Sequence, residues 1–251
     1  MPESTEVMAG STGAIRLVDN ASDNAAGRLA GLLRRDLLSG RYPSGERLKE
    51  EELAARFGAG RYTVRTAVRM LVDSGLLDHR PHRGASVPLL TADRVHEVSA
   101  YREVLEVGAL RLALQRGADL SAVVTATKAL EDLPDDAPWI DVVECHQAIH
   151  TNLMVAAGND RLVGAYLLCE EELRYIVSTV RPDFSASRLA ALHTRLIVGI
   201  RRGGDAAVMA LEEDLRTGRQ AVLDALHPPD VVTPPTETPA VDAAAAIGEP
   251  T

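Results

Sequence analysis

Aromatic residues, cysteines and long apolar runs are all scarce in this sequence. Phe, Trp and Tyr together make up 3% of the 251 residues, so a core must consist mainly of aliphatic side chains. The two cysteines, Cys145 and Cys169, are too few for a disulfide framework and agree with a reducing compartment. The apolar runs fall far short of the roughly 20 residues that a membrane span needs. The first residues have no secretory signal pattern. We therefore expect a cytoplasmic protein with no membrane partner.

The charge is distributed unevenly along the chain. The formal net charge is −9, yet residues 25–88 hold twelve Arg and Lys against seven Asp and Glu, a net charge of +5. The remainder must then carry −14 (−9 less +5). A basic segment joined to an acidic body is typical of a DNA-binding domain joined to a ligand-binding domain.

Four segments are expected from composition and pattern. Residues 1–22 are small and polar and predict a disordered arm, and residues 228–251 are rich in Pro, Thr and Ala and predict a disordered tail. Between them we expect a DNA-binding domain over residues 23–90 and an all-α domain over residues 91–227.

Residues 23–90 have the element order of a winged helix-turn-helix. Helices are predicted at about 24–38, 50–57 and 60–75, and two short strands around Pro81–Gly84 form a β-hairpin wing. The third helix has an apolar stripe with helical spacing, which consists of Val64, Ala67, Val68 and Leu71.

The segment after Thr91 is helical throughout. Six helices are predicted, at about 92–117, 119–131, 137–157, 160–180, 185–202 and 205–226. No window there alternates as a strand does. The predicted fold class is therefore mainly α, with the winged domain followed by an all-α six-helix bundle.

Three arginines, Arg61, Arg65 and Arg69, share one stripe of the third helix, opposite its apolar face. An arginine near the start of such a helix can bind the O6 and N7 edge of guanine, or phosphate. A solvated basic face would have the same spacing, so the stripe alone does not decide. The short helix, the tight turn and the following hairpin favour binding to double-stranded DNA.

The stretch GRYPSGERLKEEELAARFGAGRYTVRTAVRMLVDSGLLDHRPHRGASV, residues 40–87, resembles the DNA-binding domain of the GntR family of bacterial repressors. The resemblance implies that Arg61 and Arg65 contact bases or backbone and that Gly60 and Tyr62 flank them at phosphate-contacting positions. It also implies a wing tip in the minor groove that consists of His82, Arg83 and Gly84. Four positions depart from the family pattern. Gly60 replaces a usual Ser, and Tyr62 and Thr63 stand where the family often has Thr-Pro. Glu51 replaces a DNA-facing Arg and would repel phosphate.

The stretch HQAIH, residues 146–150, places two histidines one helical turn apart, where both can bind one metal ion. In zinc proteases of the H-E-x-x-H type, the second position is the general base. Here it is Gln147, which cannot accept a proton. We therefore expect no catalytic turnover, although a metal-dependent enzyme built on the helical domain remains an alternative.

The longer stretch HQAIHTNLMVAAGNDRL resembles the signature D-x-x-F-H-x-x-L-x-x-A-A-G-N-x-x-L of the FCD ligand domain in FadR-type GntR regulators. That family's metal site takes one Asp and three His. Here His146 stands at the Asp position, His150 and His193 match histidines, and Asp214 stands at the remaining histidine position. The resemblance implies a divalent ion (Zn, Ni or Mn) held by these four residues, with one Asp and one His exchanged. Asp214 reaches the histidine position only if Gly203–Gly204 is an insertion relative to the family. The alternative interpretation is that these histidines bind no metal.

Residues 102–106 match the R-x-x-L-E pattern of the same family. The resemblance implies that Arg102 faces the metal cavity and binds a small carboxylate effector. An Arg102–Glu106 pair on a solvated face is the alternative. A domain of six rather than seven helices resembles that of the VanR-like group of this family. The predicted function is a homodimeric, ligand-responsive transcriptional regulator, expected to be a repressor, on a short palindromic operator; a regulator whose metal is purely structural is the further alternative.

Overall fold

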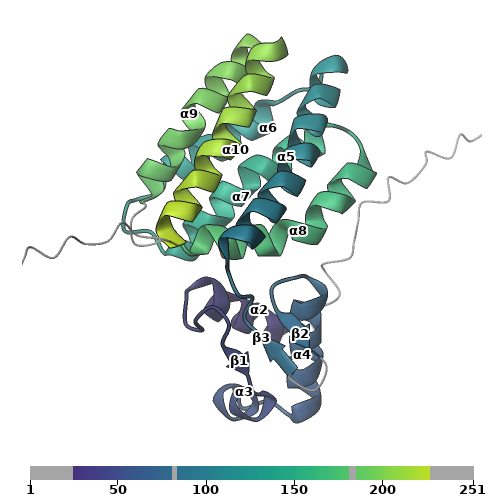
Figure 1. The fold of residues 1–251 in the computed structure, drawn as a ribbon, viewed down its shortest axis with the longest axis vertical. Helices are drawn as coiled ribbons and strands as arrows, with labels where there is room; N and C mark the ends of the chain where they lie inside the picture. Colours follow the sequence, from purple (N-terminus) through teal and green to yellow (C-terminus); the bar gives the residue numbers. More distant parts are fainter. Residues whose placement is uncertain (1–24, 81–83, 181–184, 227–251) are drawn as a thin grey trace, which may run out of the picture.

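The computed structural model describes residues 25–80, 84–180 and 185–226. The arm expected over residues 1–22 and the tail expected over residues 228–251 lie outside the described residues. Within them a small winged unit is followed by a larger helical bundle, and the two lie end to end (Figure 1). No described helix combines the length and the apolar character that crossing a membrane requires.

The first unit is a winged helix-turn-helix, as predicted. Its helices are α2 (Ala25–Leu38), α3 (Glu50–Phe57) and α4 (Arg61–Asp73). The predicted hairpin consists of the antiparallel strands β2 (Asp78–Arg80) and β3 (Gly84–Ser86). An additional strand, β1 (Arg47–Leu48), pairs with β3 and gives the sheet order β1-β3-β2. This strand was not expected, because two residues are too short to give an alternating pattern.

The turn between α3 and α4 is built on glycine. Gly58 ends α3 with φ 60°, in the left-handed region that side chains with a Cβ avoid. Gly60 then precedes α4 in an extended conformation. The turn directs the predicted stripe of α4 into the core of the unit, where Val64, Ala67, Val68 and Leu71 are all buried. The opposite face of α4 is therefore exposed.

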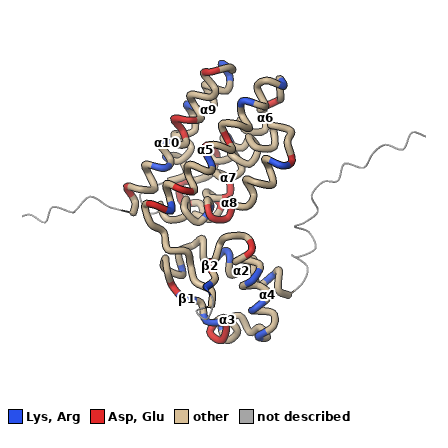
Figure 2. The backbone as a smooth tube through the Cα atoms, turned by 45° about the vertical axis from the view of Figure 1, so that its right-hand side comes forward, with Lys and Arg blue, Asp and Glu red and all other residues tan. Residues whose placement is uncertain are grey.

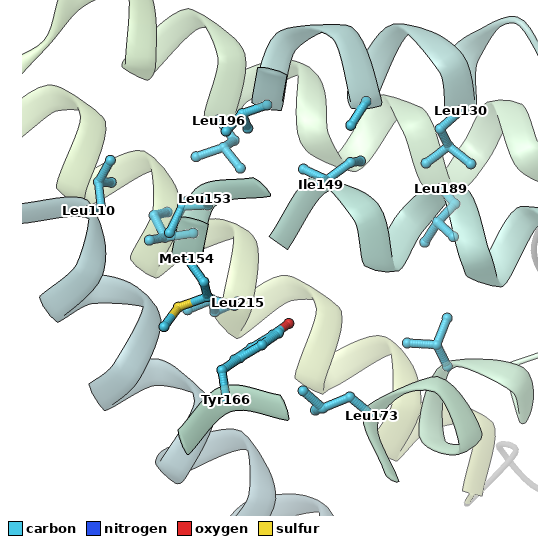
Figure 3. Packing of buried hydrophobic residues seen from close by; sticks show 14 of the residues in the cluster. Leu110, Leu130, Ile149, Leu153, Met154, Tyr166, Leu173, Leu189, Leu196 and Leu215 are labelled. Carbon is cyan, nitrogen blue, oxygen red and sulfur yellow. The ribbon is translucent and has the colours of Figure 1, made fainter. Parts of the chain in front are cut away.

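The second unit is an all-α bundle. Its helices are α5 (Ala92–Gln115), α6 (Ser121–Glu131), α7 (Trp139–Ala156), α8 (Asp160–Ser178), α9 (Ala186–Arg202) and α10 (Gly204–Leu226). Side chains from α5, α7, α8, α9 and α10 point into one interior (Figure 3). Three of these helices begin at side-chain caps, because the side chains of Thr91, Asn159 and Ser185 accept hydrogen bonds from backbone N–H groups of the first turn.

Helices α9 and α10 pack very closely, and a glycine makes this possible. A Cβ atom on Gly199 would collide with the Cβ of Ala210 and would lie 2.8 Å from the carbonyl oxygen of Ala206. The two helices are joined by Gly203 and Gly204, both with positive φ. The short connection and the close approach fix how residues of α10 face residues of α9.

Helix α8 lies at the end of the bundle that faces the winged unit (Figure 1). Tyr175 of α8 is buried in the core of the winged unit, and its hydroxyl donates a hydrogen bond to the carbonyl oxygen of Pro88, at 3.3 Å. The same helix contributes Tyr166, Leu173 and Ile176 to the core of the bundle. α8 therefore belongs to both cores.

Candidate functional site

Helix α4 presents a basic, exposed face. The side chains of Arg61, Arg65 and Arg69 are 77%, 70% and 83% exposed, and Tyr62 is also exposed. Gly60 has no side chain to cap the helix, and there is no acidic residue in the first turn. The start of α4 is therefore a favourable place for an anion such as phosphate.

Acidic residues of α3 lie beside this basic face (Figure 2). Glu51 Oε1 is 3.6 Å from Arg61 Nη2, and Glu50 Oε2 is 3.4 Å from Arg65 Nε. These pairs are exposed and long, so each contributes little to stability. They partly neutralise the arginines that would meet DNA.

The wing is described only in part. Gly84 begins β3 with φ 74°, which favours glycine there. His82 and Arg83, which were expected at the wing tip, lie outside the described residues.

Three buried histidines meet inside the bundle. His146 and His150 lie on α7 and His193 lies on α9, with relative exposures of 6%, 1% and 2%. Their ring centroids are 5.0 to 5.3 Å apart, and one nitrogen from each ring lies within 4.8 Å of the other two. This is a geometry in which three imidazoles can share one metal ion.

The hydrogen bonds of two histidines leave acceptor nitrogens facing each other. His150 Nδ1 is 2.8 Å from Glu106 Oε2, and His193 Nδ1 is 3.0 Å from the carbonyl oxygen of Leu189. Because both partners are acceptors, each Nδ1 carries the hydrogen and each Nε2 of a neutral ring is an acceptor. The two Nε2 atoms lie 3.3 Å apart. Two acceptors at this distance need a cation or a proton between them.

A metal ion satisfies this arrangement better than a proton. Burial lowers the pKa of His150, and the nearby charge of Arg102 lowers it further; burial and then the neighbouring His150 hold the pKa of His146 well below its ordinary value. Two nitrogens bound at about 2.0–2.1 Å to a tetrahedral ion lie roughly 3.3–3.4 Å apart. The residues present therefore fit a divalent metal ion.

Asp214 approaches the three histidines from α10. It is 8% exposed, and its Oδ2 is 3.7 Å from His193 Nε2. Its Oδ1 and the Nδ1 of His146 are buried and make no hydrogen bond in the structure. Buried polar atoms without partners are costly, and a cation would supply a partner for both side chains.

A carboxylate that was not expected in this role, Glu106, connects the histidines to Arg102. Glu106 is fully buried; its Oε1 accepts a hydrogen bond from Arg102 Nε at 2.6 Å, and its Oε2 accepts one from His150. Burial alone would raise the pKa of Glu106, but Arg102 and His150 outweigh it and lower the pKa to about 2. The alternative of an Arg102–Glu106 pair on a solvated face is therefore wrong, because the pair is inside the bundle.

Gln147, which argued against a hydrolase, is also buried. Its Nε2 donates a hydrogen bond to the hydroxyl oxygen of Tyr166 on α8, at 2.7 Å. A side-chain amide in this place joins α7 to α8 and offers no base beside the histidines.

A network of ion pairs joins the bundle to the winged unit. Arg34 of α2 donates two hydrogen bonds to Glu171 of α8, at 2.6 and 3.1 Å, and its Nη1 is 2.7 Å from Glu144 of α7. Arg174 contacts the same two carboxylates from the bundle side. We call these four residues the interdomain network. The pairs of Arg34 with Glu144 and Glu171 were not expected, because the partners are far apart in the sequence.

A second link runs through the start of α5. Arg94 Nε is 2.5 Å from Glu172 of α8, and Arg94 Nη1 is 3.2 Å from Asp78 of β2. Of two consecutive residues of α8, Glu171 thus contacts the winged unit directly at Arg34, and Glu172 contacts it through Arg94, which pairs with Asp78 of β2.

Comparisons with known proteins match both units. Residues 25–87 match the family model of bacterial regulatory proteins of the gntR family, and residues 97–217 match the model of the FCD domain. The chain is 30% identical over 134 residues to an uncharacterized HTH-type transcriptional regulator, YdhC, of Bacillus subtilis, an alignment that covers 52% of this chain and 59% of that protein. It is 26% identical over 169 residues to a probable D-xylose utilization operon transcriptional repressor of Paenarthrobacter nicotinovorans, covering 67% of this chain and 75% of that protein.

Solved structures share the fold. A putative transcriptional regulator GntR from Rhodococcus sp. RHA1 superimposes with a TM-score of 0.65 at 24% identity, over 80% of this chain and 98% of that one. The structure of E. coli McbR/YncC gives a TM-score of 0.63 at 16% identity, over 81% of this chain and 99% of that one. Among the curated relatives, the alignments with YdhC and with the Nta operon transcriptional regulator of Aminobacter aminovorans span 59% and 64% of those proteins' own lengths.

Proposed function

The chain belongs to the GntR family of bacterial regulatory proteins and is a transcriptional regulator with an FCD domain rather than an enzyme, and from this premise we propose that it is a metal-containing, homodimeric repressor that responds to a small carboxylate. We assign residues 23–90 to the DNA-binding domain, residues 91–227 to the effector domain, and the protein to the cytoplasm. The six-helix bundle supports the VanR-like group of the FadR subfamily.

The exposed face of α4 supports DNA binding through Arg61 and Arg65, with Gly60 and Tyr62 at the phosphates. We place the wing tip, which consists of His82, Arg83 and Gly84, in the minor groove. Because one winged unit presents one recognition helix, it can bind one half-site. A palindromic operator is therefore bound by two copies of the chain.

The four buried residues His146, His150, His193 and Asp214 would hold the metal ion, which we propose is Zn, Ni or Mn. The acceptor nitrogens that face each other and the unpartnered Asp214 Oδ1 support this assignment. When bound, the ion would supply positive charge that attracts a carboxylate. Arg102 would donate a hydrogen bond to the same carboxylate, and Glu106 orients both His150 and Arg102.

The observation that carries the proposed regulation is the double role of α8. This helix contributes Leu173 and Ile176 to the bundle interior beside the histidines, and it holds the winged unit through Glu171 and Tyr175. A ligand that favours one position of α8 would favour one orientation of the winged unit. Two half-sites can then be bound together in one state and not in the other.

The DNA-binding part is tested with Arg65→Ala in a gel-shift titration on the operator. We expect a loss of about 1–3 kcal/mol if this side chain binds a base edge. Arg216→Ala is the matched control, because Arg216 is an exposed arginine of α10 that pairs only with its neighbour Glu213. Equal affinity of Arg65→Ala and wild type, with circular dichroism unchanged, would remove Arg65 from the interface.

The metal site is tested by metal analysis of the purified protein and by a swap. His146→Asp alone and Asp214→His alone should each weaken metal binding and lower the melting temperature, because a bound metal stabilises the folded state. The double variant should largely restore both. His96→Ala, which changes an exposed histidine, is the control. Additive losses in the double variant would show that Asp214 is not one of the ligands. If the purified wild-type protein contains no metal, the proposed metal site is wrong.

A further inference from the structure

A cavity adjoins the three histidines and is mostly apolar. It lies between α5, α8, α9 and α10, and His146 and Arg102 line one part of it. Aliphatic side chains from three helices line most of the rest, among them Leu173, Ile176, Val177, Leu189, Leu192 and Leu215. Ser99, Glu103 and Arg219 also line the cavity. Such a wall offers no hydrogen bond, so a hydroxyl or a charge placed against it would lose its hydration without compensation.

The polar part of the cavity carries unused hydrogen-bonding capacity. Arg102 donates its Nε–H to Glu106, but its Nη2 is buried and has no partner. His146, which is 6% exposed, likewise has a buried Nδ1 without a partner. Leaving such atoms unsatisfied costs free energy. An arginine donor and the proposed cation beside it together favour one carboxylate group at this place.

Apart from Arg102 and His146, the described residues that line the cavity offer a second carboxylate only the hydroxyl of Ser99 and the guanidinium of Arg219. The remaining arginine there, Arg219, has its Nη1 3.6 Å from Glu103, which lines the same cavity. The charge of Arg219 is therefore already partly compensated, and Glu103 would repel an anion. A ligand with two separated acid groups would place the second one against the aliphatic wall or beside Glu103.

The cavity is small, with a volume of about 50 Å³. This is room for a few water-sized groups, at roughly 10–15 Å³ each. A ligand that brings more than a few carbon atoms must extend through the open side of the cavity or move a wall, and Leu173, Ile176 and Val177 make α8 one of those walls. An apolar body would thus act on the helix that holds the winged unit.

We propose that the effector is a compact monocarboxylate with an apolar body, such as a short fatty acid or an aromatic acid, whose carboxylate binds at Arg102 and His146 and whose body lies against α8, α9 and α10. This inference rests on the proposed function as a carboxylate-responsive regulator and names the chemical class of its ligand. The aliphatic wall disfavours dicarboxylates and polyhydroxylated acids.

The test is isothermal titration calorimetry on the full-length protein with the metal it carries when purified. Hexanoate and benzoate are compared with succinate, gluconate and the neutral hexanamide, and metal content is checked before and after. We expect hexanoate or benzoate to bind at least tenfold more tightly than succinate, gluconate and hexanamide. Operator affinity is measured by gel shift with the same compounds.

Two variants separate the carboxylate end from the apolar end. Arg102→Gln should weaken hexanoate at least tenfold without weakening hexanamide. Leu192→Ala enlarges the cavity and should shift the preferred length in the series butanoate, hexanoate and octanoate toward octanoate, which a merely destabilised protein would not do. Leu168→Ala is the control, because Leu168 is an exposed leucine of α8 that does not line the cavity.

The outcomes are distinguishable. Tighter binding of succinate or gluconate than of hexanoate and benzoate overturns the apolar-body inference and leaves the carboxylate effector standing. If no acid binds and none changes operator affinity, both the inference and the proposed effector response fail. If the length preference is unchanged in Leu192→Ala, the body of the ligand does not occupy this cavity.

Discussion

Replacing Arg34 by methionine should weaken the contact between the two units without leaving a cavity in either core. Methionine keeps much of the aliphatic stem but removes two hydrogen bonds to Glu171 and the ion pair with Glu144. The side chains of Arg34 and Glu171 are 24% and 17% exposed, so their pair is only partly screened, whereas Glu144 is 39% exposed and contributes little.

The size of the effect depends on the ion pairs that Arg34→Met leaves in place. A hydrogen-bonded charge pair of this kind contributes about 1.5–3 kcal/mol when buried, and removing one partner of a fully buried pair costs about 3–5 kcal/mol. Here Arg174 stays within 2.8 Å of Glu171 and 3.1 Å of Glu144, so neither carboxylate loses all compensation. We therefore expect Arg34→Met to cost about 1–2 kcal/mol, a factor of roughly 5–30 in the equilibrium between docked and undocked units.

The assay is calorimetric unfolding together with operator binding in metal-loaded and chelator-treated protein. Weaker docking should separate the unfolding of the two units into distinct transitions, and the ratio of the two operator affinities should move toward one. Arg111→Met is the control, because Arg111 and Glu212 form an exposed, 3.7 Å pair within the bundle. If Arg34→Met unfolds like wild type and keeps the same affinity ratio, the interdomain network does not transmit the state of the bundle.

Three further variants or measurements address single residues. Gly60→Ser should raise the free energy of unfolding by roughly 0.5–1 kcal/mol, because Gly60 is extended, a Cβ added there meets nothing, and serine caps helices. The urea midpoint should rise accordingly, and a lower midpoint would contradict this. Glu51→Gln should tighten operator binding about two- to fivefold at low salt, because it frees Arg61 from a carboxylate, with a smaller gain at high salt. If the variant and the wild type bind with equal affinity at both salt concentrations, Glu51 does not neutralise Arg61. Burial raises the pKa of Cys169 to about 11, so about 0.1% of it is thiolate at pH 8. Peptide mapping should therefore find iodoacetamide on Cys169 only after unfolding. Rapid labelling of the native protein would show that the thiol is accessible.

The helices were predictable because the chain marks their ends locally. Glycines or side-chain caps stand at most of the boundaries, and the apolar stripe of α4 has a clear helical period. β1 escaped prediction because Arg47 and Leu48 become a strand only through pairing with Ser86 and Ala85. The presence of Tyr175 of α8 in the core of the winged unit was also not predictable, because it depends on how the two units pack against each other.

The proximity of the four candidate ligands was predictable, but the contacts that support them were not. Motif spacing brought attention to His146, His150, His193 and Asp214, and the fold does bring their side chains close together. Glu106 was expected at most as the partner of a surface arginine, because an Arg and a Glu four residues apart are common on exposed helices. Only the packing of α5 against α7 reveals that the carboxylate of Glu106 also binds His150, and the local sequence pattern gives no signal of that contact.

The proposed exchange of Asp and His relative to the family signature would have a consequence for the cavity. The four donors remain three imidazoles and one carboxylate, so the charge at the proposed ion is unchanged. Their arrangement differs, because His146 lines the cavity beside Arg102, whereas Asp214 is not among the residues that line it. A carboxylate at position 146 would compete with an incoming acid for the unpartnered Nη2 of Arg102 and would repel it. A neutral imidazole there leaves Arg102 and the proposed cation free to attract one carboxylate, while the carboxylate on α10 stays on the side of His193.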